Sequence, residues 1–108
     1  MIISKSKQYI KDYKKIIINK HLDKEKLRIN NIENLIISST NMKVLLNSPY
    51  KSIYHIEAKK GSLKEYYIAR INEKLRLIMK PVGEYPYEII NIEEIEFINI
   101  DDKHYGEG

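Results

Sequence analysis

The apolar residues of the first quarter of the chain recur at the spacing of an α-helix. The first stripe consists of Tyr9, Ile10, Tyr13, Ile16 and Ile17, with lysines on the opposite side. Ser6 stands before this stripe, and a serine there can accept a hydrogen bond from the first turn of a helix. The pattern predicts an amphipathic helix that begins after Ser6.

A second helical stripe follows Asp23, which can cap a helix in the same way. This stripe consists of Leu27, Ile32, Leu35 and Ile36 and ends before the polar residues 38–41. Residues 42–46 can add one further turn, which Pro49 closes, because a proline disfavours helical backbone in the residue before it. Two amphipathic helices are therefore predicted in residues 1–45.

Beyond residue 53 the pattern changes to short segments rich in Ile and Tyr, separated by turn-like residues. The segments that predict strands are residues 53–58, 66–71, 75–80 and part of 89–100, the last as the final and central strand. Helices first and strands after predict an α+β fold, with two N-terminal helices packed on one face of a small antiparallel, twisted sheet. The length and the lack of repeats or linkers predict a single domain over residues 1–108.

Composition narrows the class of protein. Hydrophobic residues make up 43% of the chain and charged residues 31%, which is typical of a soluble globular protein. The lack of cysteine fits a reducing compartment, and no apolar run approaches a membrane span or a signal peptide. We therefore expect a cytoplasmic protein that makes no contact with a membrane. Because no metal-ligand set or nucleotide-binding loop stands out, no metal or other cofactor is expected.

The net charge of +4 is compatible with a nucleic-acid partner or with an acidic protein partner. Basic residues concentrate in residues 5–15 and 59–80. The lysine face of the first helix could follow ribosomal RNA, or it could be the solvated side of an amphipathic helix. DNA binding is less well supported, because no helix carries a face suited to reading bases.

The segments 66–71 and 75–80 read as a hairpin that carries two arginines. If its loop has three residues, Arg70 lies opposite Arg76, and both guanidinium groups share one face of the sheet. A phosphate would satisfy such a pair, since guanidinium groups bind phosphate oxygens with two hydrogen bonds. A surface arginine pair with glutamates nearby explains the same pattern, and a two-residue loop would break the pairing.

Four short motifs follow one another in the second half of the chain. They are Lys60-Gly61-Ser62-Leu63, Tyr66-Tyr67-Ile68-Ala69-Arg70, Leu75-Arg76-Leu77 and His104-Tyr105. In order and spacing this set, over residues 55–106, resembles the RelE/HigB superfamily of type II toxin–antitoxin toxins, and most closely its HigB-like killer proteins.

The resemblance implies an endoribonuclease, an mRNA interferase that cuts mRNA in the ribosomal A site. In that chemistry the 2′-hydroxyl of the RNA attacks the adjacent phosphate without a metal. It also implies a cognate antitoxin, expected to be a helix-turn-helix protein of the HigA type. The alternative function is a catalytically silent relative that binds RNA or a protein without cutting.

The resemblance also assigns roles to residues. It places Arg76 at the transition-state phosphate, and it makes Lys59, Lys60, Arg70 and Lys74 candidate RNA contacts. A structural salt bridge for Arg76 and plain solvation for the lysines are the competing interpretations.

The acid and the base are expected among Glu57, His55 and His104. His104 has an ordinary pKa of roughly 6.5, suited to proton transfer near neutrality, and Tyr105 beside it could stack on a base or orient the phosphate. Glu57 falls on a catalytic glutamate of one branch of the superfamily. His55 would share a face of the predicted strand with Glu57, so either could be the base. For His104 the other possibility is simple exposure, and for Tyr105 a place at the edge of the core.

Overall fold

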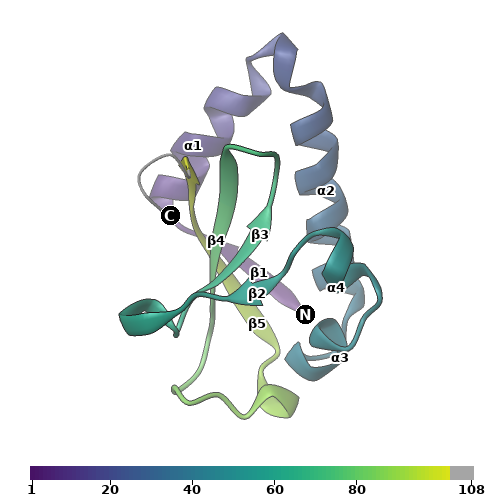
Figure 1. Cartoon of the computed structure of the whole chain (residues 1–108), viewed down its shortest axis with the longest axis vertical. Helices are drawn as coiled ribbons and strands as arrows, with labels where there is room; N and C mark the ends of the chain where they lie inside the picture. Colours follow the sequence, from purple (N-terminus) through teal and green to yellow (C-terminus); the bar gives the residue numbers. More distant parts are fainter. Residues whose placement is uncertain (103–108) are drawn as a thin grey trace.

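The structure is organised around a sheet whose strands come from both ends of the chain (Figure 1). The computed structural model describes residues 1–102, which contain five strands in the spatial order β1-β5-β4-β3-β2. The strands are β1 (Ile2–Lys5), β2 (Glu57–Ala58), β3 (Tyr67–Arg70), β4 (Leu75–Pro81) and β5 (Glu94–Asp102). The helices are α1 (Lys7–Ile17), α2 (Asp23–Ser38), α3 (Met42–Leu46) and α4 (Tyr50–Ile53). The predicted α+β class is confirmed.

Helix α1 begins where the sequence predicts it. The Ser6 side chain accepts a hydrogen bond from the backbone N–H of Tyr9 at 3.0 Å and donates one to the carbonyl of Ile98 on β5. The ring of Tyr9 then packs edge-on against Phe97, with 5.2 Å between the ring centroids. The cap and the ring contact together fix α1 against the sheet.

Helix α2 differs from its prediction at its start and on its buried face. A short 3-10 turn, Lys20–Leu22, leads into it, so Asp23 is its first residue and not a side-chain cap. Leu27 is 61% exposed, while Ile29, Ile32 and Ile36 are fully buried. Because each residue turns a helix by about 100°, Leu27 lies roughly 200° around the axis from Ile29 and cannot share its face.

The strand predicted over residues 53–58 is wrong in its first half. Ile53 ends α4, and His55 has a φ of 52°, so the chain turns before only two residues, Glu57–Ala58, join the sheet as β2. Ile53 is exposed and Ile56 is buried. Apolar character alone therefore did not distinguish a short helix and turn from an edge strand.

The sheet is mixed, because β1 pairs in parallel with β5. Neither this pairing nor the strand itself is apparent from the two apolar residues at the start of the chain. β5 lies inside the sheet, but β4 and not β5 is its middle strand. None of the helices in residues 1–102 is long and apolar enough to cross a membrane.

The core lies between the sheet and the first two helices. Tyr9 and Ile16 of α1 and the three buried isoleucines of α2 pack there with Leu77, Met79, Ile95 and Phe97 of the sheet. The hydroxyl of Tyr9 is buried without a hydrogen-bond partner among the described residues, and burial raises the pKa of Tyr9 well above its usual value. The helices thus cover one face of the sheet and leave much of the other open.

Candidate functional site

The β3–β4 hairpin has the three-residue loop on which the sequence argument depends. Ile71 donates its N–H to the carbonyl of Leu75 at 3.0 Å, and Arg70 is the direct partner of Arg76. The side chain of Asn72 holds the loop. Its Oδ1 accepts from the backbone N–H groups of Lys74 and Leu75 at 2.8 and 2.7 Å. The predicted register is therefore confirmed.

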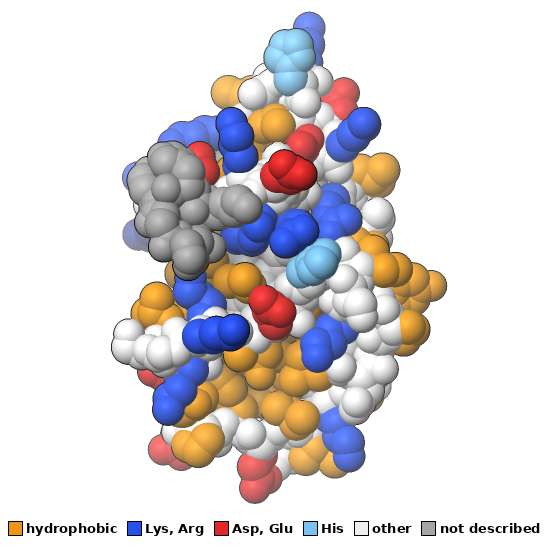
Figure 2. Space-filling view, viewed as in Figure 1, with side chains coloured by type: hydrophobic (Ala, Val, Ile, Leu, Met, Phe, Trp, Pro, Cys, Tyr) orange, Lys and Arg blue, Asp and Glu red, His pale blue; other side chains and the backbone are white. Residues whose placement is uncertain are grey.

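The two arginines lie on the face of the sheet that the helices leave open. In β4 the residues on either side of Arg76, Leu75 and Leu77, contribute to the core, so alternation places Arg76 on the opposite face. Asp101 of β5 pairs with Arg76 from the other side, which puts the three charged residues in one row. Lysine and arginine side chains gather over this hairpin in Figure 2.

Arg76 is held in place by the turn. It is only 7% exposed, and its Nη1 donates hydrogen bonds to the backbone carbonyls of Asn72 and Leu75, at 3.1 Å in the second case. Because a guanidinium group has five N–H donors in a fixed plane, bonds from one nitrogen orient the whole group. The turn therefore presets the orientation of the Arg76 guanidinium.

Arg70 has different surroundings. Its Nε is buried without a hydrogen-bond partner in residues 1–102, and no described carboxylate forms an ion pair with it. An unpaired buried donor on a cation is costly unless another group satisfies it. The Arg70 side chain thus keeps hydrogen-bonding capacity that the described residues do not use.

A third arginine, from α2, supports this end of the hairpin. Arg28 donates from Nε to the carbonyl of Arg70 and from Nη2 to that of Ile53, both at 2.7 Å. Its guanidinium carbon lies 5.0 Å from the centroid of the Tyr54 ring. Sequence reasoning missed Arg28, because on its own helix it is one polar residue among several, and only the fold brings it to β3.

Glu57 reaches the same open face from the edge strand. It pairs with Ile68, which precedes Arg70 by two residues and so shares its face. His55 does not share a strand with Glu57, so the predicted common face is wrong. The turn that contains His55 is still joined to β3, since the carbonyl of Tyr54 accepts from the N–H of Arg70 at 2.8 Å.

The remaining sequence candidates are dispersed. Lys74 is exposed in the hairpin loop, and Lys60 is exposed before a 3-10 turn at Gly61–Leu63. Lys59 lines a pocket described below. His104 and Tyr105 lie outside the described residues. The structure therefore brings together Arg70 and Arg76, with Glu57 on the same face and His55 in a turn joined to β3.

A small pocket on the open face adjoins the arginine row. Its volume is about 300 Å³, and it is lined by Lys59, Leu63, Tyr66, Ile78, Ile98, Asn99 and Asp101. A bulge in β5 interrupts the register between Ile78 and Met79, so that Ile98 and Asn99 both line the pocket. Only Lys59 of this set was a sequence candidate. Ile98 and Asn99 were not foreseen together, because an Ile-rich strand gives no local signal for the position of a bulge.

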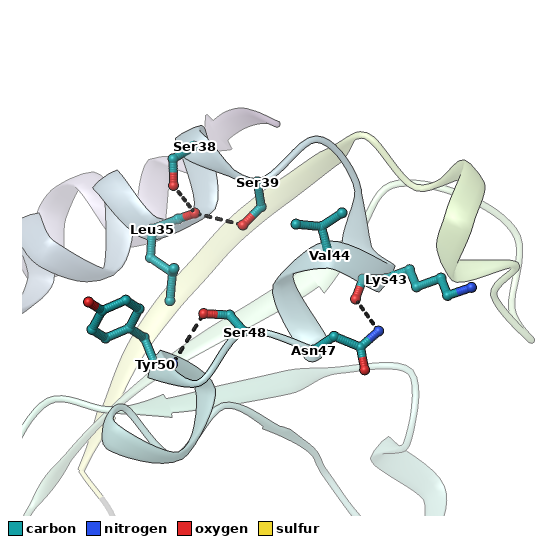
Figure 3. Close-up of a pocket in the computed structure, with 8 residues that line it drawn as sticks. All are labelled: Leu35, Ser38, Ser39, Lys43, Val44, Asn47, Ser48 and Tyr50. Atoms are coloured by element: carbon teal, nitrogen blue, oxygen red, sulfur yellow. Dashed lines mark hydrogen bonds between the residues drawn. The ribbon is translucent and has the colours of Figure 1, made fainter.

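A larger hollow, of about 570 Å³, lies away from the hairpin between the end of α2 and helices α3 and α4 (Figure 3). Its serine hydroxyl groups already have backbone partners: Ser38 and Ser39 donate to the carbonyl of Leu35, and Ser48 accepts from the N–H of Tyr50. Lys43 is its only ionisable side chain besides Tyr50. This lining contains no histidine, carboxylate or arginine.

Comparison with known proteins identifies the fold. No protein-family model matches the sequence, and no curated protein matches it either. A crystal structure of YafQ from E. coli BL21(DE3) is 20% identical, covers 98% of this chain and 97% of its own, and has a TM-score of 0.64. The E. coli DinJ–YafQ toxin–antitoxin complex gives 23% identity, 98% and 96% coverage and a TM-score of 0.65. The YoeB dimer from Staphylococcus aureus gives 25% identity, 94% coverage of both chains and a TM-score of 0.62.

Proposed function

The chain has the fold of the RelE superfamily of toxins, and on that premise we propose that it is the toxin of a type II toxin–antitoxin system, acting as an endoribonuclease on mRNA. The observation that carries the proposal is the pairing of Arg70 with Arg76 on the open face of the sheet. Two guanidinium groups at directly paired positions of adjacent strands suit the oxygens of a phosphodiester.

The proposed reaction needs no group beyond the RNA and side chains. The 2′-oxygen of one nucleotide attacks the adjacent phosphorus, the bond from phosphorus to the 5′-oxygen breaks, and a 2′,3′-cyclic phosphate and a 5′-hydroxyl result. Negative charge builds on the phosphate oxygens in the transition state, where a preset cation is most effective. Arg76, oriented by the turn, and Arg70, with its unsatisfied Nε, supply that charge.

Two proton transfers complete the reaction. A base removes the proton of the 2′-hydroxyl, and an acid gives one to the departing 5′-oxygen. Glu57 is the candidate base on the open face, and His55 is an alternative from the adjoining turn. His104 is proposed as the acid and Tyr105 as a group that stacks on a base or orients the phosphate. Lys59, Lys60 and Lys74 are proposed to contact the RNA backbone.

The partners follow from the same premise. The YafQ and YoeB structures include complexes of YafQ with DinJ, described as a toxin–antitoxin complex, and of YoeB with YefM. By extension, this chain binds a cognate antitoxin, of the helix-turn-helix HigA type. Its substrate is mRNA in the ribosomal A site, which places its action in the cytoplasm.

Induced expression in bacteria tests the proposal. We expect the wild-type chain to arrest growth and Arg70→Ala to relieve the arrest, because losing one donor to the transition state lowers the rate by about 100- to 1,000-fold. Arg76→Lys, which keeps the charge and loses the planar fork, is expected to relieve it in part.

Lys43→Ala, in the hollow away from the hairpin, is the matched control and should remain toxic. Circular dichroism of each purified variant checks that it is folded. Growth that continues with the wild type, or equal arrest by a folded Arg70→Ala variant, would contradict the proposal and support a silent binding module.

A further inference from the structure

The pocket beside the arginine row has the composition of a nucleobase site. Tyr66 supplies an aromatic ring, and Leu63, Ile78 and Ile98 supply further apolar surface. Polar groups come together on one strand, at Asn99 and Asp101. A base has two apolar faces and a polar edge, and proteins that read single-stranded RNA stack such a base on an aromatic ring and bond its edge. The volume, about 300 Å³, is at the small end of ligand sites.

The position of the pocket relates it to the proposed site of cleavage. Asp101 is the direct strand partner of Arg76, and Ile78 is two residues from Arg76 on the same face. Side chains of direct partners have Cβ atoms roughly 5 Å apart. A nucleotide whose phosphate lies at the arginines therefore has its base within reach of Asn99 and Asp101.

We propose that this pocket binds a guanine base next to the cleaved phosphate, and that Asp101 is the residue that selects it. The inference rests on the proposed nuclease function for its substrate class. The Asp101 carboxylate makes no hydrogen bond or ion pair with any residue in the described part of the chain, so its oxygens are available as acceptors.

The chemistry of the base edges gives the selectivity. An ionised carboxylate only accepts hydrogen bonds, and it can accept two side by side. Guanine presents two adjacent donors, N1–H and N2–H, on its Watson–Crick edge. Adenine and cytosine place a donor beside an acceptor, and uracil has a single donor between two acceptors, so each sets at least one acceptor against the carboxylate.

The neighbouring residues complete the site. Tyr66 provides a ring on which any base can stack, so it contributes affinity without selectivity. The ammonium group of Lys59, also in the lining, offsets the negative charge that Asp101 brings near RNA. Asn99 can donate or accept and so does not discriminate by itself.

Binding of the four ribonucleoside 3′-monophosphates tests the inference without any cleavage. The purified chain is titrated with each nucleotide and followed by amide chemical shifts. We expect the wild type to bind 3′-GMP about 10- to 100-fold more tightly than the other three, the discrimination of a good bidentate contact. Asp101→Asn should lose most of that preference, while Tyr66→Leu should weaken all four nucleotides alike.

Glu93→Gln makes the same carboxylate-to-amide change outside the pocket and should leave the preference intact. Equal affinities for the four nucleotides in the wild type, or a guanine preference that survives in a folded Asp101→Asn variant, overturns the inference. The results also distinguish a failure of the nuclease proposal from a failure of the guanine-pocket proposal. A chain that prefers guanine but cuts no RNA contradicts the nuclease function alone, and a chain that cuts RNA without the preference contradicts the pocket alone.

Discussion

Arg70 and Arg76 face each other across two strands, yet their side chains are held in different ways. Arg76 is buried and bonded to the carbonyls of its own turn, while the Nε of Arg70 has no partner in residues 1–102. The first arrangement presets the orientation of a cation, and the second leaves a buried donor of a cation without a partner among these residues.

Tyr87 is a residue whose protonation affects stability at high pH. Its hydroxyl donates to the carbonyl of Glu65 at 2.7 Å, and burial, with the charge of Glu65, raises its pKa to about 12. An unfolded tyrosine loses its proton near pH 10, so between about pH 10 and 12 the folded state binds more protons and stability falls as the pH rises.

We therefore expect Tyr87→Phe to cost about 1 kcal/mol at neutral pH, through the lost hydrogen bond. The variant should lose less stability than the wild type between pH 10 and 12. Urea unfolding at several pH values measures both effects. Parallel stability curves for the two proteins up to pH 12 would show that Tyr87 is not the group responsible.

The site residues that could be predicted from the sequence were those placed by a regular local pattern. Arg70 and Arg76 were found because strand alternation and a three-residue loop place them together by simple geometry. Arg28 and Asp101 were not assigned to the site. Arg28 comes from a helix 42 positions before Arg70, and Asp101 meets Arg76 only through the pairing of β4 with the final strand. Contacts between distant segments leave no pattern in a single sequence.

At the scale of elements, the β3–β4 turn is the structure that aligns the arginine pair. Asn72 accepts two backbone N–H bonds within the turn, and its Nδ2 donates to Oε2 of Glu25 on α2 at 2.9 Å. Helix α2 thus contacts both the turn, through Glu25, and the end of β3, through Arg28. The register of the hairpin and the position of α2 are coupled.

We expect Asn72→Ala to lower the free energy of unfolding by about 1–3 kcal/mol, because the half-buried N–H of Leu75 and the exposed N–H of Lys74 both lose their acceptor. Asn72→Asp keeps those acceptors but sets a carboxylate against Glu25, so it should cost less at low pH than at neutral pH. Asn30→Ala, on the exposed side of α2, is the control and should change stability little. Chemical denaturation measures all three. An Asn72→Ala variant as stable as the wild type would mean that the turn holds its register without this side chain.

The elements with strong local signals were the ones predicted well. Ser6 and the stripe after it define α1, and the alternating segments around the loop define β3 and β4. β1 was missed because Ile2–Lys5 becomes a strand only by pairing with β5, at the other end of the chain. The end of α4 at Ile53 was mistaken for strand because Ile favours both the interior of a sheet and an apolar helix face.

At the scale of the whole molecule, the two long helices cover one side of the sheet and leave the arginine-bearing side open. β1, at the start of the chain, pairs with β5, and α1 packs against β5. The N-terminal third of the chain therefore covers and stabilises strands that come late in the sequence. The open face carries the arginine pair and the pocket that Asp101 lines. A surface of this kind suits an extended, negatively charged ligand.

The ends of the RNA fragments test this account most directly. mRNA from a translating extract treated with the purified chain would be mapped, and the chemistry of the new termini determined. We expect new 5′ ends that carry a hydroxyl and new 3′ ends that carry a 2′,3′-cyclic phosphate, with cleavage lost in Arg70→Ala and retained in Lys43→Ala. Fragments with 5′-phosphates, or cleavage that Arg70→Ala leaves unchanged, would contradict a 2′-hydroxyl attack stabilised by the arginine pair.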